Sequence, residues 1–439
     1  MKINEKSVKS FWDKRARLKK YKNYASITQF DDTEEGEKRN EIELEQLKNL
    51  KIQKNSIALD IGCGTGRYSK ILSKKCKKVY ALDYSKPMID LAKKINSEKN
   101  INYICIDATK FIKNIKFDLI LVTGVFIFLN NDSMEKIISN VSKMLKKEGK
   151  VFVRGSVGIK ERFELIDKYS NELKTNYNAI YRTPEEHHKI FVKYGLIPIE
   201  EKLLYQFRKE TAQMQFIYMR ERVVGILGGM GPYASLDVYK KILDNFKTEK
   251  DWEYPRLLID SNTKIPSRTR AILYSEESPE KYLEKSIENL GKIGADIVVI
   301  ACNSAHYFLK KKTKTPIKNI IEIVYEEVKK DNIEKVGLIA GTVTVNKKLY
   351  ENIFKDIKVI TLPEYQDKVI YLIDKVKKGT YNNKDKILTK EIIDALLKKG
   401  CKKIILGCTE LPFLYKSDIT YDVNDILSKY IIKYAKREI

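Results

Sequence analysis

Two cysteines are set in matching surroundings, each at the end of an apolar run and just before polar residues that favour a helix start. Cys302 lies in ACNSAH (301–306), and Cys408 lies in GCTELP (407–412), 106 residues further on. A thiol at a helix N-terminus ionises more readily, because the positive end of the helix dipole lowers its pKa. Two such groups on opposite sides of one cleft can invert a carbon centre, since one thiolate removes a proton and the other thiol returns one from the far side. The alternative is a pair of structural cysteines, because free cysteine is often buried.

A glycine-rich segment carries a second chemical pattern. Residues 56–69, SIALDIGCGTGRYS, predict a buried strand over 57–61, a turn with glycine at every second position, and the start of a helix. Such glycines let the backbone approach a ligand closely, and the helix N-terminus favours polar or anionic groups. A second strand over 79–83 ends in Asp83, a carboxylate that suits the hydroxyl pair of a ribose. The pattern predicts a site for a nucleoside-containing cofactor, and by itself it also fits a dinucleotide-dependent dehydrogenase.

Alternating strand and helix patterns must position these residues, and they occur twice along the chain. An apolar run at 223–227 breaks into GGMGP near the midpoint, which is how a new α/β unit begins. We therefore predict an α/β protein with a Rossmann-like domain over 1–221 and, after a short linker, a domain over 222–439 made of two similar α/β halves with the active site between them. The predicted strands span 57–61, 79–83, 103–106, 117–122, 151–154, 196–205, 213–220, 223–227, 256–260, 297–301, 335–340 and 403–406, and the predicted helices span 133–147, 235–246, 279–293, 366–377 and 387–399.

The first domain resembles the class I S-adenosylmethionine-dependent methyltransferases over roughly residues 40–220. The similarity is carried by ALDIGCGTG, the acid of VYALDYS, the IDA after the third strand, FDLILVTGVF and LKKEGKVFV. The resemblance implies S-adenosylmethionine as the cofactor and argues against the dehydrogenase. It assigns the amino-acid end of the cofactor to Asp60, Gly62, Gly64 and Gly66, the ribose to Asp83, and the adenine to Asp107 and Ala108.

The methyl acceptor is poorly defined by the sequence. Methyl transfer depends mainly on holding a nucleophile in line with the sulfonium methyl group, so no general base is required and none is apparent. Arg154, Tyr181 and Arg182 either meet an acidic acceptor or lie on the surface. The aromatic residues at 11–12 and 21–30 either cover the active site as a lid or serve in packing.

The segment TPEEHH (183–188) predicts a helix start. Thr183 fits the N-cap, and Glu186 three residues later completes a capping box. His187 and His188 are adjacent, so they point to different faces of the helix and lack the spacing of helical metal ligands. We therefore predict no metal site here.

The second domain resembles the aspartate/glutamate racemase family over residues 223–439, closest to its aspartate racemase branch. GILGGMGP, IPSRT, IACNSAHYF, GTVT and ILGCTELPFL carry the similarity. The resemblance implies proton transfer by Cys302 and Cys408 without pyridoxal phosphate or metal, and a homo-oligomer formed through this domain. It places Met230 and Gly231 along the substrate, Asn303, Ser304 and Thr409 at its α-carboxylate, Arg268 at its side-chain carboxylate, and Thr344 and Lys377 nearby, with Lys378 as the alternative to Lys377.

Three positions depart from the family pattern. Ser267 stands where aspartate is usual, Ser304 where threonine is usual, and Val343 where glycine is usual. Both thiols are retained, which argues against a decarboxylase relative with one cysteine. The departures therefore leave the preferred acidic amino acid open.

The composition limits the partners and the compartment. The formal net charge is +25, but only 14 of the 84 basic residues are arginine, which dominates base readout, so nucleic-acid binding is not expected. The chain has no apolar run long enough for a membrane span and no secretory signal pattern. The other cysteines, at 63, 76, 105 and 401, form no CxxC pair, which favours a reducing cytoplasm.

These observations predict a bifunctional cytoplasmic enzyme that acts on small molecules. One domain would methylate a small, acidic amino-acid-like acceptor with S-adenosylmethionine, and the other would racemise aspartate or a related acidic amino acid. Two alternatives stay open. The first domain can be a regulator that binds the cofactor, or it can be a nucleic-acid methyltransferase fused to the racemase.

Overall fold

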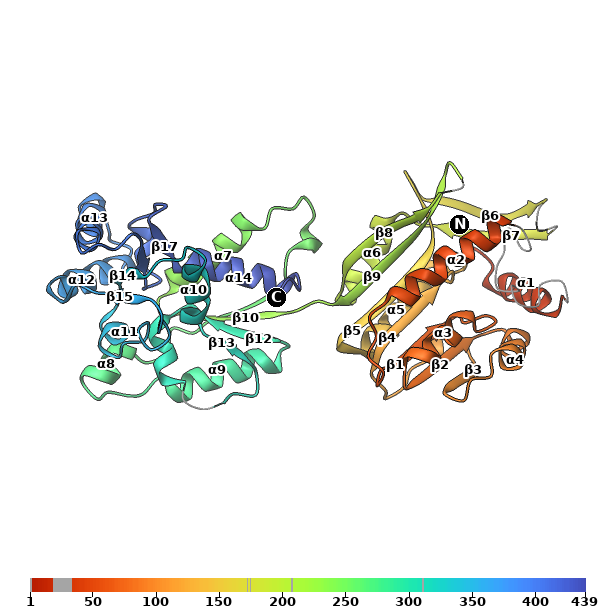
Figure 1. Cartoon of the computed structure of the whole chain (residues 1–439), viewed down its shortest axis with the longest axis horizontal. Coiled ribbons are helices and arrows are strands. Elements are labelled where there is room, and N and C mark those ends of the chain that lie inside the picture. The colour runs from red at the N-terminus through yellow and green to blue at the C-terminus, as the bar shows by residue number, and fades with distance from the viewer. Residues whose placement is uncertain (1, 19–33, 172, 174, 207, 310–311) are drawn as a thin grey trace. The chain divides into compact units, whose positions relative to one another are not determined.

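The chain forms two compact units, Met1–Glu221 and Arg222–Ile439 (Figure 1). The structure, a computed structural model, describes residues 2–18, 34–171, 173, 175–206, 208–309 and 312–439. The aromatic segment at 21–30, considered above as a lid, lies outside the described residues. Among the described helices, none combines the length and hydrophobicity needed to cross a membrane.

The first unit is built on a seven-stranded sheet in the order β3-β2-β1-β4-β5-β9-β8. The first five strands are parallel, whereas β9 runs antiparallel to β5 and β8 runs antiparallel to β9 at one edge. The strands are β1 (Ile57–Ile61), β2 (Lys78–Asp83), β3 (Ile101–Cys105), β4 (Phe117–Thr123), β5 (Leu145–Gly158), β8 (Leu196–Tyr205) and β9 (Thr211–Arg220). The helices are α1 (Glu5–Arg17), α2 (Glu34–Asn49), α3 (Arg67–Lys75), α4 (Lys86–Ile95), α5 (Asn131–Met144) and α6 (Pro184–Lys193).

Side chains alternate between two cores on the faces of this sheet. Leu59 and Ile120 pack with α5, whereas Ala58 and Leu119 pack with α2 and α3. This alternation follows from the two-residue period of a strand, and burial on both faces explains why the sequence of these strands is almost continuously apolar. The Rossmann-like architecture is confirmed.

A two-stranded hairpin, for which the sequence predicted no strands, lies between β5 and α6. It consists of β6 (Phe163–Ser170) and β7 (Thr175–Tyr181). Its buried side chains form a small separate core with Val8 of α1 and Phe128, and Trp12 packs against this core. The hairpin therefore anchors α1 beside the end of β4.

The second unit contains two four-stranded parallel sheets with the same strand order. The orders are β11-β10-β12-β13 and β15-β14-β16-β17, so β12 and β16 hold equivalent places. The strands are β10 (Val224–Gly228), β11 (Leu257–Ser261), β12 (Ile297–Ile300), β13 (Ile317–Lys318), β14 (Lys335–Ile339), β15 (Lys358–Ile360), β16 (Ile404–Leu406) and β17 (Thr420–Asp422). The helices are α7 (Pro232–Asn245), α8 (Arg268–Leu273), α9 (Glu280–Lys292), α10 (Ile320–Lys329), α11 (Thr342–Asn346), α12 (Gln366–Lys377), α13 (Asn383–Lys398) and α14 (Val423–Ala435). The predicted duplication is thus present in the topology.

One continuous core joins the two halves of this unit. Val299 of β12 and Leu338 of β14 belong to the same buried cluster, which also takes in residues of α7, α10 and α14. Each sheet packs its other face on separate helices, α9 in the first half and α12 with α13 in the second. The shared core fixes the ends of β12 and β16 relative to each other.

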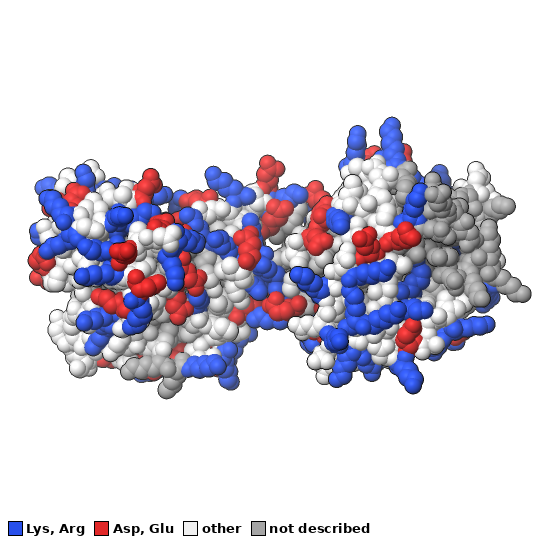
Figure 2. Space-filling view, in the orientation of Figure 1, with Lys and Arg blue, Asp and Glu red and all other residues white. Residues whose placement is uncertain are grey.

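The charges are dispersed over the surface. Figure 2 shows Lys and Arg interspersed with Asp and Glu on the face drawn. Many of these are ion pairs between residues four positions apart, such as Lys86–Asp90 and Lys281–Glu277. Exposed pairs of this kind add little stability. Their dispersed arrangement explains the high content of charged residues without a dedicated binding surface.

Candidate active sites

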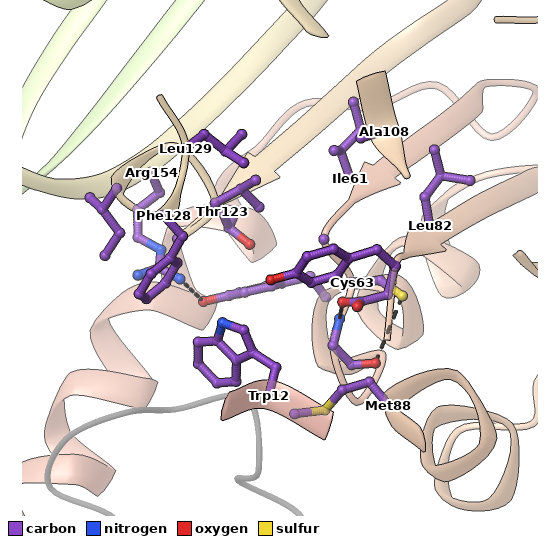
Figure 3. A pocket seen from close by; sticks show the side chains of 18 of the residues that line it. Trp12, Ile61, Cys63, Leu82, Met88, Ala108, Thr123, Phe128, Leu129 and Arg154 are labelled. Carbon is purple, nitrogen blue, oxygen red and sulfur yellow. Dashed lines mark hydrogen bonds between the residues drawn. The ribbon is translucent and has the colours of Figure 1, made fainter. Parts of the chain in front are cut away.

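A pocket in the first unit lies at the carboxyl ends of β1, β2 and β4 (Figure 3). Five of the seven residues predicted to bind the cofactor line it. They are Gly62, Gly64, Asp83, Asp107 and Ala108. Gly62 has a φ of +71°, and a Cβ there would lie 2.3 Å from the Val125 Cγ2 atom. Glycine at this position therefore leaves a backbone surface that a ligand can approach.

The remaining two predicted residues, Asp60 and Gly66, do not line the pocket. Asp60 is fully buried, and its Oδ2 atom accepts a hydrogen bond of 2.6 Å from the Ser69 hydroxyl of α3. Burial raises the pKa of Asp60 to about 6. Gly66 is the N-cap of α3 with a φ of +79°. Neither residue lines the pocket, and the Asp60 Oδ1 atom has no hydrogen-bond partner among the described residues, so contact of Asp60 and Gly66 with the cofactor stays a prediction.

Asp83 stands at the end of β2 with its carboxylate held by two backbone groups. Its Oδ2 atom accepts from the Gly64 N–H (3.0 Å), and its Oδ1 atom accepts from the Ser85 N–H (2.9 Å). Burial raises the pKa of Asp83 to about 6 despite these hydrogen bonds. Asp107 caps η2 (Ala108–Lys110) by accepting from the Thr109 N–H.

The other side of the same pocket is polar and charged. Arg154 of β5 donates to Glu43 of α2 (2.8 Å) and to the Tyr68 hydroxyl (3.0 Å), and all three line the pocket. Burial alone would raise the pKa of Glu43, but the charges of Arg154, Arg39 and Arg67 bring it down to about 2. Figure 3 shows Arg154 with Phe128 on one side of the pocket and Leu82 with Ala108 on the other.

Placement of Arg154, Tyr181 and Arg182 on the surface, the simpler alternative from the sequence, is wrong for all three. Arg182 donates to the Phe126 and Leu129 carbonyl groups and so holds the loop after β4. Tyr181 stacks on Phe163 of the hairpin. Only Arg154 of the three lines the pocket.

The histidine pair serves in packing and in a polar contact. The capping box of Thr183 and Glu186 is present at the start of α6. His187 is buried between Phe126 and Phe216, and burial lowers its pKa to about 3. His188 contacts the Tyr218 hydroxyl and Glu201. Within the described ranges, no cluster of three or more His, Cys, Asp or Glu side chains is arranged to hold a metal ion.

Trp12 of α1 lines this pocket as well. Its ring meets Phe128 edge to face with centroids 5.4 Å apart. The contact combines the two roles considered for the N-terminal aromatic residues, because Trp12 both packs on the hairpin core and borders the cavity. Phe11 contacts Trp12 and Tyr177 instead.

A second pocket, of about 300 Å³, contains both cysteines of the matching segments. Cys302 follows β12 in the first half of the second unit, and Cys408 follows β16 in the second half. Seven of the eight predicted substrate contacts line the pocket as well: Met230, Arg268, Asn303, Ser304, Thr344, Lys377 and Thr409. Gly231 and Lys378 do not line it, although a Cβ at Gly231 would lie 3.2 Å from the Glu410 Oε1 atom.

The two thiols have different neighbours. The Cys302 Sγ atom lies 3.4 Å from the Ser304 hydroxyl, and Cys302 is the N-cap of η5 (Asn303–Phe308). The Cys408 thiol donates to the Glu410 Oε2 atom over 3.0 Å. Burial and then the negative charge of Glu410 raise the pKa of Cys408 well above its usual value.

The predicted lowering of the Cys408 pKa by a helix N-terminus is therefore wrong. The short helix η7 begins at Leu411 with Glu410 as its N-cap, so Cys408 lies outside the helix start. Burial and the Glu410 carboxylate, not a helix dipole, determine the pKa of this thiol. Glu410 is only 2% exposed, and the sequence reasoning missed it as a functional candidate. The sequence feature that could have identified Glu410 is a carboxylate two positions after a cysteine that follows a strand.

Two polar side chains in this pocket retain unused hydrogen-bonding groups. Arg268 donates to the Met230 carbonyl (2.6 Å) and the Pro266 carbonyl (3.2 Å), while its Nε atom has no partner among the described residues. The Asn303 Oδ1 atom accepts from the Tyr350 hydroxyl (2.9 Å), and its buried Nδ2 atom likewise lacks a described partner. Donors of this kind suit a carboxylate ligand.

Comparison with known proteins places a family in each unit. Residues 59–153 match the model of a methyltransferase domain, and residues 227–426 match the model of the Asp/Glu/hydantoin racemases. The chain is 30% identical to wheat (Triticum aestivum) phosphoethanolamine N-methyltransferase 1 over 139 residues, 30% of this chain and 26% of that protein. It is 28% identical to glutamate racemase of Carboxydothermus hydrogenoformans over 174 residues, 37% of this chain and 63% of that protein.

The chain thus spans about a quarter of the first of these relatives and less than two thirds of the second. Among solved structures, an aspartate racemase of Picrophilus torridus is 27% identical and covers 49% of this chain and 94% of its own, with a TM-score of 0.45. The matches to the two family models show that the chain carries a methyltransferase domain followed by a domain of the Asp/Glu/hydantoin racemase family.

Proposed function

We propose that the chain is a bifunctional enzyme. The first unit transfers a methyl group from S-adenosylmethionine to a small acceptor related to acidic amino acids, and the second racemises aspartate or a similar acidic amino acid without pyridoxal phosphate. The observation that carries the proposal is that Cys302 and Cys408, from equivalent places in two duplicated sheets, line one pocket. Each family model matches enzymes that act on different substrates. The methyl acceptor and the amino acid named here are therefore part of the proposal.

In the proposed racemisation, one deprotonated cysteine removes the α-proton of the substrate and the other cysteine donates a proton to the opposite face. Arg268 and Lys377 supply positive charge for the two carboxylates of an acidic amino acid. Glu410 accepts the hydrogen bond of the Cys408 thiol and so keeps Cys408 protonated and ready to donate.

The first pocket fits S-adenosylmethionine in its donor set. Asp83 offers a carboxylate for the ribose hydroxyl groups, and the Gly62–Gly64 turn offers a backbone surface that a side chain would fill. When bound, the cofactor supplies an electrophilic methyl group. The protein's part is to exclude water and to align the acceptor, with Trp12 and Phe128 closing one side of the cavity.

The direct test follows both reactions in the purified full-length protein. In D₂O, NMR should show loss of the α-proton signal from L-aspartate, L-glutamate or one of their N-methyl forms. In a second assay, S-adenosylhomocysteine should accumulate when S-adenosylmethionine and the same compounds are supplied together. Absence of exchange with every compound, methylated or not, would contradict the racemase proposal. Cofactor binding without turnover would instead favour a regulatory first unit.

Replacement of Glu410 by glutamine (E410Q) is expected to lower the pKa of Cys408, because it removes the negative charge while preserving the shape of the side chain. Alkylation of Cys408 by iodoacetamide at pH 8 should become faster, and racemisation should slow by about 10- to 100-fold because less Cys408 remains in the thiol form that donates a proton. Peptide mass spectrometry can follow Cys408 with Cys302 as the internal reference. An unchanged alkylation rate in E410Q would show that the carboxylate does not control this thiol.

A further inference from the structure

Three polar side chains of the first pocket are not explained by cofactor binding. Arg154 and Ser156 occupy alternate positions of β5, and Gln213 pairs with Ser156 across the β5–β9 ladder. Residues two apart on a strand, and residues paired across strands, share one face of the sheet. All three line the pocket, and Arg154 and Gln213 are only 7% and 3% exposed. They form a wall that we call the β5–β9 wall.

Gln213 has one polar end in a hydrogen bond and one end without a described partner. Its Oε1 atom accepts from the Ser156 hydroxyl over 2.8 Å, which fixes which end of the amide is used. Its buried Nε2 atom has no hydrogen-bond partner in the described part of the chain, and the same is true of the Arg154 Nε atom. A buried donor without a partner costs free energy, so a ligand that supplies an acceptor atom to these N–H groups would gain affinity.

The charges at this wall favour a negative ligand. Arg39, Arg67 and Arg154 line the pocket with Glu43 among them, whereas the other acidic lining residues, Asp83 and Asp107, belong to the part assigned to the cofactor. Glu43 remains ionised because its pKa is about 2, so it offsets one of the three positive charges. Charged donors and a low local dielectric make such a wall selective for anionic oxygen atoms.

The location separates this wall from the part of the pocket assigned to the cofactor. In the sheet, β4 lies between β1, which precedes the glycine turn, and β5, which carries Arg154. In Figure 3, Arg154 lies across the pocket from Leu82 and Ala108. Trp12 and Phe128 lie near Arg154 and limit the size of what can bind there.

We propose that the β5–β9 wall is the acceptor subsite of the methyltransferase and that it binds an anionic oxygen group, a carboxylate or a phosphate, of a small methyl acceptor. The inference rests on the proposed methyl transfer. Arg154 and Gln213 hold the anionic group by hydrogen bonds, and the rest of the acceptor extends toward the cofactor. A neutral analogue of the same size lacks the charge that these donors match.

The fluorescence of Trp12 allows a test that does not report binding in the racemase pocket. The chain has two tryptophans, Trp12 at the first pocket and Trp252 in the second unit. In the full-length W252F protein, fluorescence therefore reports on Trp12 alone. After saturation with S-adenosylhomocysteine, we expect a saturable change on titration with L-aspartate or succinate, or with O-phosphoethanolamine, at constant ionic strength. Succinamide, the uncharged diamide of succinate, should give none.

The carboxylate and phosphate titrations identify which anion the wall prefers. Failure of every anion to bind, although S-adenosylhomocysteine binds, would overturn the inference and leave the proposed function intact. Failure of S-adenosylhomocysteine itself to bind would instead contradict the proposed function. Binding of succinamide as tightly as succinate would also overturn the inference.

Variants of the wall separate the acceptor from the cofactor. Q213L in the W252F background should weaken anion binding by about tenfold, since a hydrogen bond to a charged group is lost, with little change in affinity for S-adenosylhomocysteine. R154K should do the same while keeping a charge beside Glu43. The matched control is Q215L, because Gln215 is equally buried on β9 but does not line the pocket. Equal effects of Q213L and Q215L, or a loss confined to the cofactor's affinity, would refute the assignment.

Discussion

Replacement of either Cys302 or Cys408 by alanine is expected to reduce racemisation by about 10²- to 10⁴-fold, the usual contribution of a positioned acid or base. Each thiol serves one face of the substrate, so loss of one leaves the other able to remove a proton only from the enantiomer that faces it. In D₂O, C302A and C408A should therefore each retain slow α-proton exchange with one enantiomer, and the enantiomers should be opposite for the two variants.

The exchange is measured by NMR on separate D- and L-samples. C401A is the control, because Cys401 is a buried free cysteine of the same unit that does not line the pocket. If C302A and C408A both exchange the same enantiomer, the two thiols do not face opposite sides of the substrate. If either variant racemises like the parent protein, that cysteine is structural.

Replacement of Asp83 by asparagine (D83N) is expected to weaken S-adenosylmethionine binding by about 100-fold, because two hydrogen bonds to a carboxylate become weaker. It should also change the pH dependence. The pKa of Asp83 is about 6 in the ligand-free protein, so the carboxyl group is increasingly protonated below that pH. Affinity should be constant above pH 6 and fall by about tenfold per pH unit below it, and D83N should lose this slope.

Calorimetric titration between pH 5 and 8 tests this expectation. Asp60 has a raised pKa of about 6 as well and lies behind the turn, so D60N is the matched variant. The slope should persist in D60N. Loss of the slope in D60N and its persistence in D83N would assign the titration to Asp60, against the ribose role proposed for Asp83.

The sequence was sufficient for most of the fold because short apolar runs, glycine turns and capping residues are local signals. Helix α12 spans the predicted 366–377 range, and β1 and β8 match their predicted bounds. The capping box at Thr183 was readable for the same reason. The β6–β7 hairpin was missed because β6 has no fully buried residue. Its sequence therefore lacks the apolar pattern by which a strand is predicted.

Parts of both candidate sites could not be predicted because they depend on partners distant in the chain. The burial of Arg154 depends on Glu43, which lies 111 residues earlier. The high pKa of Cys408 depends on its burial and on how Glu410 turns toward it, which a motif does not specify. Sequence patterns identify which residues follow strand ends, whereas tertiary contacts decide how those residues are charged and hydrogen-bonded.

The different neighbours of the two thiols have a kinetic consequence for the proposed racemisation. Mirror-image amino acids have equal free energy in water, so the equilibrium constant of the reaction is one. The Haldane relation then requires kcat/KM to be equal in the two directions, however unlike the surroundings of Cys302 and Cys408 are. The contrast between Ser304 and Glu410 can therefore appear only as compensating differences, with the enantiomer that has the higher kcat also having the higher KM.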